Sequence, residues 1–413
     1  MRNEKDTRLY EALDFIDSDL IGETAERLMA PIKPQAQNLR IKRLALIAAC
    51  ICLIAISIPV IMTLTSFDTT IVITESRPPL PFGGPNEGSV GISSNVYDGS
   101  RGLVYKLSDD GTYAVLVDVG SCTDTDITVA TAYNGLPVKS VSIGALSRCD
   151  TVESVTFPDN IEEIGIRVLS ECPSLKRVYL GAGVKIIKLH AFSACDLDEI
   201  VISPDNPRLV FRDGCVIDTS TKSLVLGIRG AVIPDDGSVE RIGYTAFCNR
   251  TGISSLVIPE GIKEISTAAF EGTDLESVTL PKSLEKLGSG VFRGCKSLRY
   301  FDLGGYSELP TSTLAGCDEI REVTGLENVT RIRSYAIEGG YLSSIKLTNS
   351  LKYIDQFAFT RSQSIGSIYF DGTVEEWNAI PKGYRWNSQM QGISIICSDG
   401  KGDPSATLEK EAN

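Results

Sequence analysis

The segment KLHAFSACDLDEIVI, residues 188–202, holds a histidine and a cysteine five residues apart. His190 is the only histidine in the chain, and an imidazole close to Cys195 is the arrangement that activates a thiolate for nucleophilic attack. This chemistry requires the two side chains to converge on one site. The elements that carry them therefore decide whether the pair is catalytic.

Both residues belong to a nonapeptide that recurs along the chain. Its nine copies begin at residues 141, 164, 187, 242, 265, 287, 309, 332 and 354. Each copy leads into a short alternating segment, such as LKRVYLG at 175, which is typical of a strand. Recurrence at this period predicts a repeat solenoid of about nine coils of 22–23 residues. We expect an α/β coil, in which a strand is followed by a tight turn and a helical or irregular return.

The repeat explains the two residues without catalysis. We number the nonapeptide positions as slots 1–9. His190 occupies slot 4, where the other copies carry unrelated residue types, and Cys195 occupies slot 9, which is cysteine in five copies. A recurrent small thiol indicates a packed turn residue rather than five nucleophiles. The sequence therefore predicts no catalytic residue, no metal site and no cofactor, and the protein is expected not to be an enzyme.

An uncharged run from Leu44 to Phe67 precedes the repeats. As a helix it would be about 36 Å long, enough to cross a hydrocarbon core of about 30 Å. Arg40, Lys42 and Arg43 stand before it and acidic residues follow, so the positive-inside rule predicts a cytoplasmic N-terminus. We expect a single-pass cell-membrane protein with an extracellular repeat domain. A cleaved signal peptide is the alternative, but the 43-residue lead is too long for an ordinary one.

The residues on either side of this run differ in composition. Residues 1–43 form the cytoplasmic segment, in which Leu9, Leu13, Ile16 and Leu20 share one helical face. Residues 68–98 are rich in Pro, Gly and Ser and are predicted to form a flexible stalk. The net charge of −13 disfavours nucleic acid as a partner.

A 55-residue offset separates the nonapeptides that begin at 187 and 242. It contains one coil and 32 extra residues, within 203–236. The apolar alternations LVFRDG and SLVLG flank the turn sequence DTSTK, which predicts a β-hairpin that protrudes from the solenoid.

The segments IGYTAFC, LVIPEGIKEIS and DNPRLVFRDGCVID resemble the BspA-like leucine-rich repeats of bacterial surface proteins. The resemblance implies a β-rich N-terminal cap at 99–140 and a C-terminal cap at 368–400. The repeats between them predict the solenoid at 141–367, and a disordered tail is expected at 401–413. Several copies depart from the pattern, with Leu in place of Phe at 146, 169 and 314. The resemblance also implies adhesion or interaction at the bacterial cell surface.

The outward side chains of the alternating strands are the candidate ligand-binding face, because stacked strands form the usual recognition surface of a solenoid. Tyrosine and arginine add groups favoured at binding hot spots. The candidate residues are Arg177, Tyr179, Val201, Val257, Tyr300, Asp302, Lys346 and Tyr369. The expected partner is an extracellular protein or glycan. The alternative function is a transmembrane sensor that passes ectodomain binding to a cytoplasmic partner of residues 1–43.

Overall fold

The computed structural model describes residues 98–390 and 392–404. The predicted cytoplasmic segment and membrane span lie outside these residues, as do nearly all of the stalk and the end of the tail. Among the residues that are described, no helix has the length and apolar character needed to cross a bilayer.

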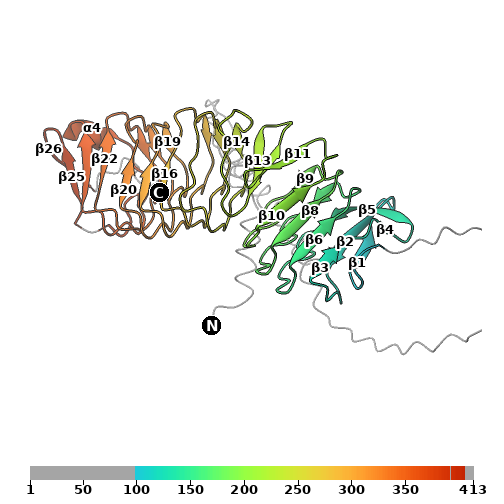
Figure 1. The fold of residues 1–413 in the computed structure, drawn as a ribbon. Helices are drawn as coiled ribbons and strands as arrows, with labels where there is room; N and C mark the ends of the chain where they lie inside the picture. Colours follow the sequence, from blue (N-terminus) through green and yellow to red (C-terminus); the bar gives the residue numbers. More distant parts are fainter. Residues whose placement is uncertain (1–97, 391, 405–413) are drawn as a thin grey trace, which may run out of the picture. The chain divides into compact units, whose positions relative to one another are not determined.

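The described chain is a β-solenoid of about 12 turns, in which successive coils stack side by side (Figure 1). Each coil contributes to two faces, which we call face A and face B. Face A consists of the alternating strands that follow the nonapeptides, and neighbouring strands pair in parallel. Its strands are β3 (Asp126–Thr128), β6 (Ser154–Phe157), β8 (Arg177–Leu180), β10 (Glu199–Ile202), β16 (Ser277–Thr279), β18 (Tyr300–Asp302), β20 (Glu322–Thr324), β22 (Ser344–Thr348), β24 (Ser367–Asp371) and β25 (Ser394–Cys397).

Face B consists mainly of two-residue strands that end at slot 1 of each nonapeptide. Parallel pairing joins them within three separate sheets. The strands are β2 (Ala114–Asp118), β5 (Leu136–Val141), β7 (Glu163–Ile164), β9 (Ile186–Ile187), β13 (Ser223–Gly227), β14 (Arg241–Ile242), β15 (Glu264–Ile265), β17 (Lys286–Leu287), β19 (Glu308–Leu309), β21 (Arg331–Ile332) and β23 (Tyr353–Ile354).

The nonapeptides are not helical, so the α/β assignment is wrong. In the described part of the chain the only α-helix is α4 (Val374–Ala379), near the C-terminus. Each nonapeptide is a pair of turns joined to the next coil by backbone hydrogen bonds. The N–H of slot 6 donates to the carbonyl of slot 5 one coil further on, as from Phe270 to Val291 at 2.9 Å. This ladder continues the sheet-like stacking between the two faces.

Two slots of every nonapeptide have a left-handed backbone. Slots 4 and 8 have positive φ in all nine copies, which explains why slot 4 shows no preferred side chain. The slot-4 residues are Gly144, Arg167, His190, Thr245, Ala268, Gly290, Ser312, Tyr335 and Phe357. The slot-8 residues are Arg148, Glu171, Ala194, Asn249, Gly272, Gly294, Gly316, Gly339 and Arg361. The constraint acts on the backbone, and a residue with a Cβ is strained there.

Neighbouring copies offer a matched test of this strain. Ala268 has φ of 55° and Gly290 has φ of 59°, and a Cβ added to Gly290 would meet nothing closer than 3.8 Å. We expect Gly290→Ala to lower the free energy of unfolding by about 1 kcal/mol. Ala268→Gly should raise it by a smaller amount, because glycine also loses more entropy on folding. Urea denaturation of both variants measures the two changes in the free energy of unfolding, which should have opposite signs. Changes of the same sign would contradict the assignment of backbone strain to slot 4.

The hairpin insertion does not protrude. Strand β11 (Leu209–Arg212) pairs antiparallel with β12 (Cys215–Asp218), and β12 pairs antiparallel with β13. Every residue of β12 is buried. Its alternate side chains enter two different hydrophobic cores: Val216 joins the core of the N-terminal coils, and Ile217 joins that of the C-terminal coils. The insertion therefore separates the two cores and contributes side chains to both, and we call it the hairpin wall.

The ends of the solenoid are closed by the predicted cap regions. At the N-terminal end, β1 (Val104–Leu107) pairs antiparallel with β2, and β4 (Ala132–Tyr133) pairs antiparallel with β5. At the C-terminal end, Trp377 and Trp386 are fully buried, with ring centroids 6.0 Å apart. The first residues of the predicted tail are ordered, because β26 (Gly400–Gly402) pairs with β25 and the Asp403 carbonyl accepts a hydrogen bond from Trp377 Nε1.

Candidate functional site

Alternation along the strands of face A sends every second side chain outward. On β8, Arg177 is exposed and Tyr179 is half-buried, whereas Val178 between them is buried. On β18, Tyr300 is 52% exposed and lies two residues from Asp302. The period of two that the sequence shows is thus the period of the face, because successive Cβ atoms of a strand point to opposite sides.

The pairing register brings several candidate residues together. Tyr179 lies opposite Val201 on neighbouring strands, and Lys346 lies opposite Tyr369. Tyr369 is 45% exposed. These pairs are adjacent on one face, so a single ligand could contact both members.

Two candidates are occupied by local contacts. Arg177 Nε lies 3.0 Å from Glu199 Oε2, on the neighbouring strand. Asp302 Oδ1 accepts a hydrogen bond of 2.9 Å from the backbone N–H of Gly304, which stabilises the turn after β18. The tyrosines and Lys346 are therefore the stronger candidates among the eight.

The stacked strands were expected to form one parallel sheet. In the structure, face A is divided. Its strands fall into three sheets, ordered β10-β8-β6-β3, β16-β18-β20 and β22-β24-β25-β26. Between β10 and β16 no described residue forms a face-A strand, and the strands in this interval, β11 to β15, belong to the hairpin and to face B. Val257 lies in this interval, in no strand, and is 74% exposed. The candidate residues therefore form three patches.

The structure separates the roles of His190 and Cys195. His190 lies on a left-handed turn, and Cys195 Sγ is buried, where it donates to the Leu169 carbonyl at 2.6 Å. The same bond recurs in other coils, where the slot-9 side chain donates to the slot-6 carbonyl of the preceding coil. It links Cys172 to Leu146 at 3.2 Å and Ser362 to Ile337 at 2.9 Å. Slot 9 thus favours a small side chain with a hydrogen to donate, and Arg250 and Gly340 are the exceptions.

The nine cysteines of the described residues are free thiols, and seven of them are buried. Burial raises the pKa of the Cys215 thiol to about 12 and that of Cys295 to about 11, because an apolar environment disfavours the thiolate. Raised pKa values are the opposite of what a nucleophilic cysteine requires. The pKa of Cys195 is instead lowered, chiefly by its hydrogen bond with Cys172 and against the effect of burial, so the assignment of Cys195 as a packing residue rests on its burial and its bond to the Leu169 carbonyl. In the described ranges, no group of three or more His, Cys, Asp and Glu side chains converges on a possible metal site.

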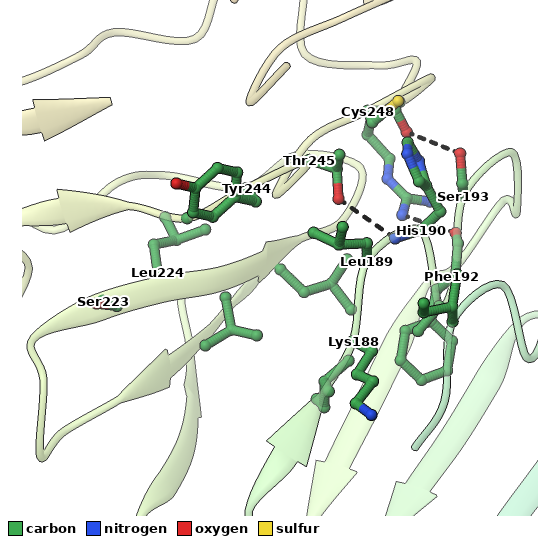
Figure 2. Close-up of a pocket in the computed structure, with 17 residues that line it drawn as sticks. Lys188, Leu189, His190, Phe192, Ser193, Ser223, Leu224, Tyr244, Thr245 and Cys248 are labelled. Carbon is green, nitrogen blue, oxygen red and sulfur yellow. Dashed lines mark hydrogen bonds between the residues drawn. The ribbon is translucent and has the colours of Figure 1, made fainter. Parts of the chain in front are cut away.

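A cavity of about 390 Å³ lies beside the hairpin wall, at the junction of two nonapeptides (Figure 2). It is lined by residues of 187–195, of β13 and of 242–250, including His190, Leu224, Tyr244 and Arg250. Sequence reasoning did not find it. The signals were the 55-residue offset and the arginine at slot 9, where other copies carry small residues.

These features define the class: a parallel β-solenoid built from short leucine-rich repeats. The BspA type leucine rich repeat region matches in six copies over residues 126–210, 227–340 and 305–379. The chain belongs to this family. The matched ranges stop within β11 and resume at the end of β13, so the unmatched residues 211–226 fall on the hairpin.

Three solved structures are similar to this chain at low identity. A leucine-rich repeat protein from Eubacterium ventriosum is 15% identical, with 76% of this chain and 98% of that chain covered and a TM-score of 0.48. A leucine rich cell surface protein from Faecalibacterium prausnitzii is 20% identical, with 70% and 98% covered and a TM-score of 0.32. The pneumococcal vaccine antigen PcpA is 14% identical, with 71% and 82% covered and a TM-score of 0.39. No curated protein sequence matches this chain.

Proposed function

We propose that this protein is a membrane-anchored surface protein whose face A binds an extracellular protein or glycan. The observation that carries the proposal is the exposure of aromatic side chains on face A at Tyr300 and Tyr369, in strands whose alternate residues are buried. Exposed aromatic rings on a rigid scaffold supply large contact areas at low entropic cost. Family membership supports this proposal, because solenoid repeats present extended binding surfaces.

The proposed anchor is the uncharged run 44–67, with the N-terminus in the cytoplasm and the solenoid outside. Protease treatment of intact cells tests this arrangement. We expect residues 98–404 to be released or degraded while an epitope at the N-terminus is protected. Protection of the solenoid would contradict an extracellular location.

Replacing Tyr179, Tyr300 and Tyr369 together by alanine should reduce ligand binding by at least about 10-fold, since each aromatic anchor contributes on the order of 1–2 kcal/mol. The measurement is binding of the soluble repeat domain to an array of glycans and matrix proteins at physiological salt. A matched control replaces Tyr384, which is 49% exposed in the C-terminal cap and lies outside face A. Equal binding by the triple variant and the parent would show that face A is not the site.

The transmembrane sensor is a second candidate, supported by the spacing of Leu9, Leu13, Ile16 and Leu20, which predicts one apolar helical face in the segment 1–43. An amphipathic helix of this kind can dock on a cytoplasmic partner. The test is a pull-down from cytosol with residues 1–43 and a scrambled peptide as control. Retention of the same proteins by both peptides would remove the support for this role.

A further inference from the structure

The cavity beside the hairpin wall arises from a coil that lacks its nonapeptide. Strand β13 pairs in parallel with β14, so it occupies a face-B position between the neighbouring coils. After β13 the chain turns at once into the next segment, and no nonapeptide fills the space between 187–195 and 242–250. Residues Ser223–Leu226 of β13 line the space that is left.

Hydrogen bonds from side chains, in place of backbone bonds, connect the two nonapeptides across this gap. His190 N–H donates to Thr245 Oγ1 at 3.3 Å, where other copies donate to a backbone carbonyl. Ser193 Oγ lies 3.5 Å from the Cys248 carbonyl (Figure 2). Side-chain bonds span a wider gap than backbone bonds, and the cavity is therefore a built feature of the fold.

Arg250 spans the remainder of the gap. Its Nη1 donates to the Cys195 carbonyl and its Nη2 donates to the Phe192 carbonyl at 3.2 Å. The residue is only 2% exposed, and its Nε has no hydrogen-bond partner among the described residues. A buried donor without a partner costs about 1–3 kcal/mol, and a ligand atom could supply that partner.

The charge of Arg250 is also uncompensated. Its hydrogen-bond partners are carbonyl oxygens, and no carboxylate forms an ion pair with it in the part of the chain that the structure describes. No aspartate or glutamate lines the cavity, although the chain carries a net charge of −13. Lys188, the other cationic lining residue, is neutralised by Glu163 at 2.8 Å. A buried guanidinium remains cationic at neutral pH and favours an anion.

The rest of the lining is mainly apolar. Leu189 and Tyr244, which are 43% and 46% exposed, line it together with Leu224 and Val225. A volume of about 390 Å³ is within the range of small-molecule sites, in which apolar walls surround a few polar groups. Apolar walls and one buried cation fit a ligand with an apolar body and one anionic end.

We propose that this cavity binds a small amphipathic carboxylate, with an aromatic or branched aliphatic body against Leu224 and Tyr244 and its carboxylate on Arg250. The site is separate from face A. Its occupation would join the two nonapeptides across the wall and so couple the N-terminal and C-terminal coils.

The single histidine makes the test direct. His190 lines the cavity, so selective isotope labelling gives one imidazole signal in the NMR spectrum of the full chain in a lipid nanodisc. The probes are 3-phenylpropionate and its uncharged amide, which share one apolar body. We expect a saturable shift of the His190 signal with the carboxylate, and an affinity at least about 10-fold lower for the amide, because charge-assisted hydrogen bonds are worth about 1.5–3 kcal/mol.

Two variants separate the site from the fold. Arg250→Gln should weaken binding of 3-phenylpropionate by at least about 10-fold. Val225→Trp fills the cavity and should abolish binding while keeping Arg250, so it decides the question if the Arg250 variant does not fold. Arg385→Gln is the control, because Arg385 is exposed and stacks on Tyr384 in the C-terminal cap. Equal affinity for acid and amide, unchanged binding by the Val225 variant, or no saturable shift would each overturn the proposal.

Discussion

Replacing Phe270 by alanine should lower the free energy of unfolding by about 4 kcal/mol. Phe270 is fully buried at slot 6, and its ring lies between two others, with centroids 5.0 Å from Phe247 and 5.5 Å from Phe292. The change removes the apolar contacts of one ring, leaves a cavity in the middle of the stack and breaks two aromatic pairs worth about 1 kcal/mol each. Urea denaturation of the repeat domain, followed by circular dichroism, measures the loss.

Phe357→Ala is the matched control. Phe357 also stacks between aromatic rings, 5.5 Å from Tyr335 and 6.0 Å from Tyr384, but it occupies slot 4 and is only half-buried. We expect the free energy of unfolding to fall by about 1 kcal/mol, because much of the Phe357 ring is already exposed to solvent and its removal costs less buried apolar surface. If the two variants lost equal stability, the slot-6 stack would not be the main element of the core.

Alkaline pH should destabilise the solenoid through its buried thiols. Desolvation raises the pKa of Cys215 and Cys248 to about 12 and that of Cys295 to about 11. A group whose pKa is higher in the folded state contributes stability that is complete below its unfolded pKa, near 9, and is lost as the pH rises toward the folded value. Each thiol should cost about 1 kcal/mol of stability per pH unit above about 9, until its folded pKa is reached. The measurement is the midpoint of urea denaturation as a function of pH.

Cys295→Ser isolates one thiol. The slot accepts serine, because Ser362 makes the equivalent hydrogen bond to the Ile337 carbonyl at 2.9 Å. The hydroxyl does not ionise in this range, so the stability of the variant should fall less steeply than that of the parent, by about 1 kcal/mol between about pH 9 and pH 10. Parallel curves for parent and variant would contradict the thiol explanation.

The repeat could be read from the sequence because packing imposes it. Slots 1, 5 and 6 are buried in nearly every copy, so Ile, Ala, Phe and Leu recur there at a fixed period. The recurrent cysteines at slot 9 were likewise correctly interpreted as packed turn residues, and the structure adds the hydrogen bond that selects them. Side-chain burial produces a periodic pattern of apolar residues in the sequence, and this pattern predicts the solenoid and the length of its coils.

Features that depend on backbone conformation, or on an element that is missing, are harder to predict from the sequence. Slot 4 carries His190, Thr245 and Tyr335 among its types, so its left-handed conformation appears as variation and not as a glycine pattern. The hairpin has the same alternation whether it protrudes or is buried between cores. The cavity depends on a nonapeptide that is missing, and only the 55-residue offset and Arg250 mark its place.

The division of face A into three sheets has a consequence for binding. Tyr300 and Tyr369 lie in different sheets, and a ligand that contacts both must span several coils. A large macromolecule meets this requirement and a small sugar does not. Face A and the cavity thus differ in the ligand size that each can accept.

Site-specific photo-crosslinking tests most directly whether face A is the binding surface. A photoreactive phenylalanine derivative replaces Tyr300 or Tyr369 on face A, or the exposed Lys286 on face B, in the soluble repeat domain. We expect crosslinks from positions 300 and 369 to the ligand that the array identifies, and none from position 286. Crosslinks from position 286 alone would contradict this expectation and place the binding surface on face B.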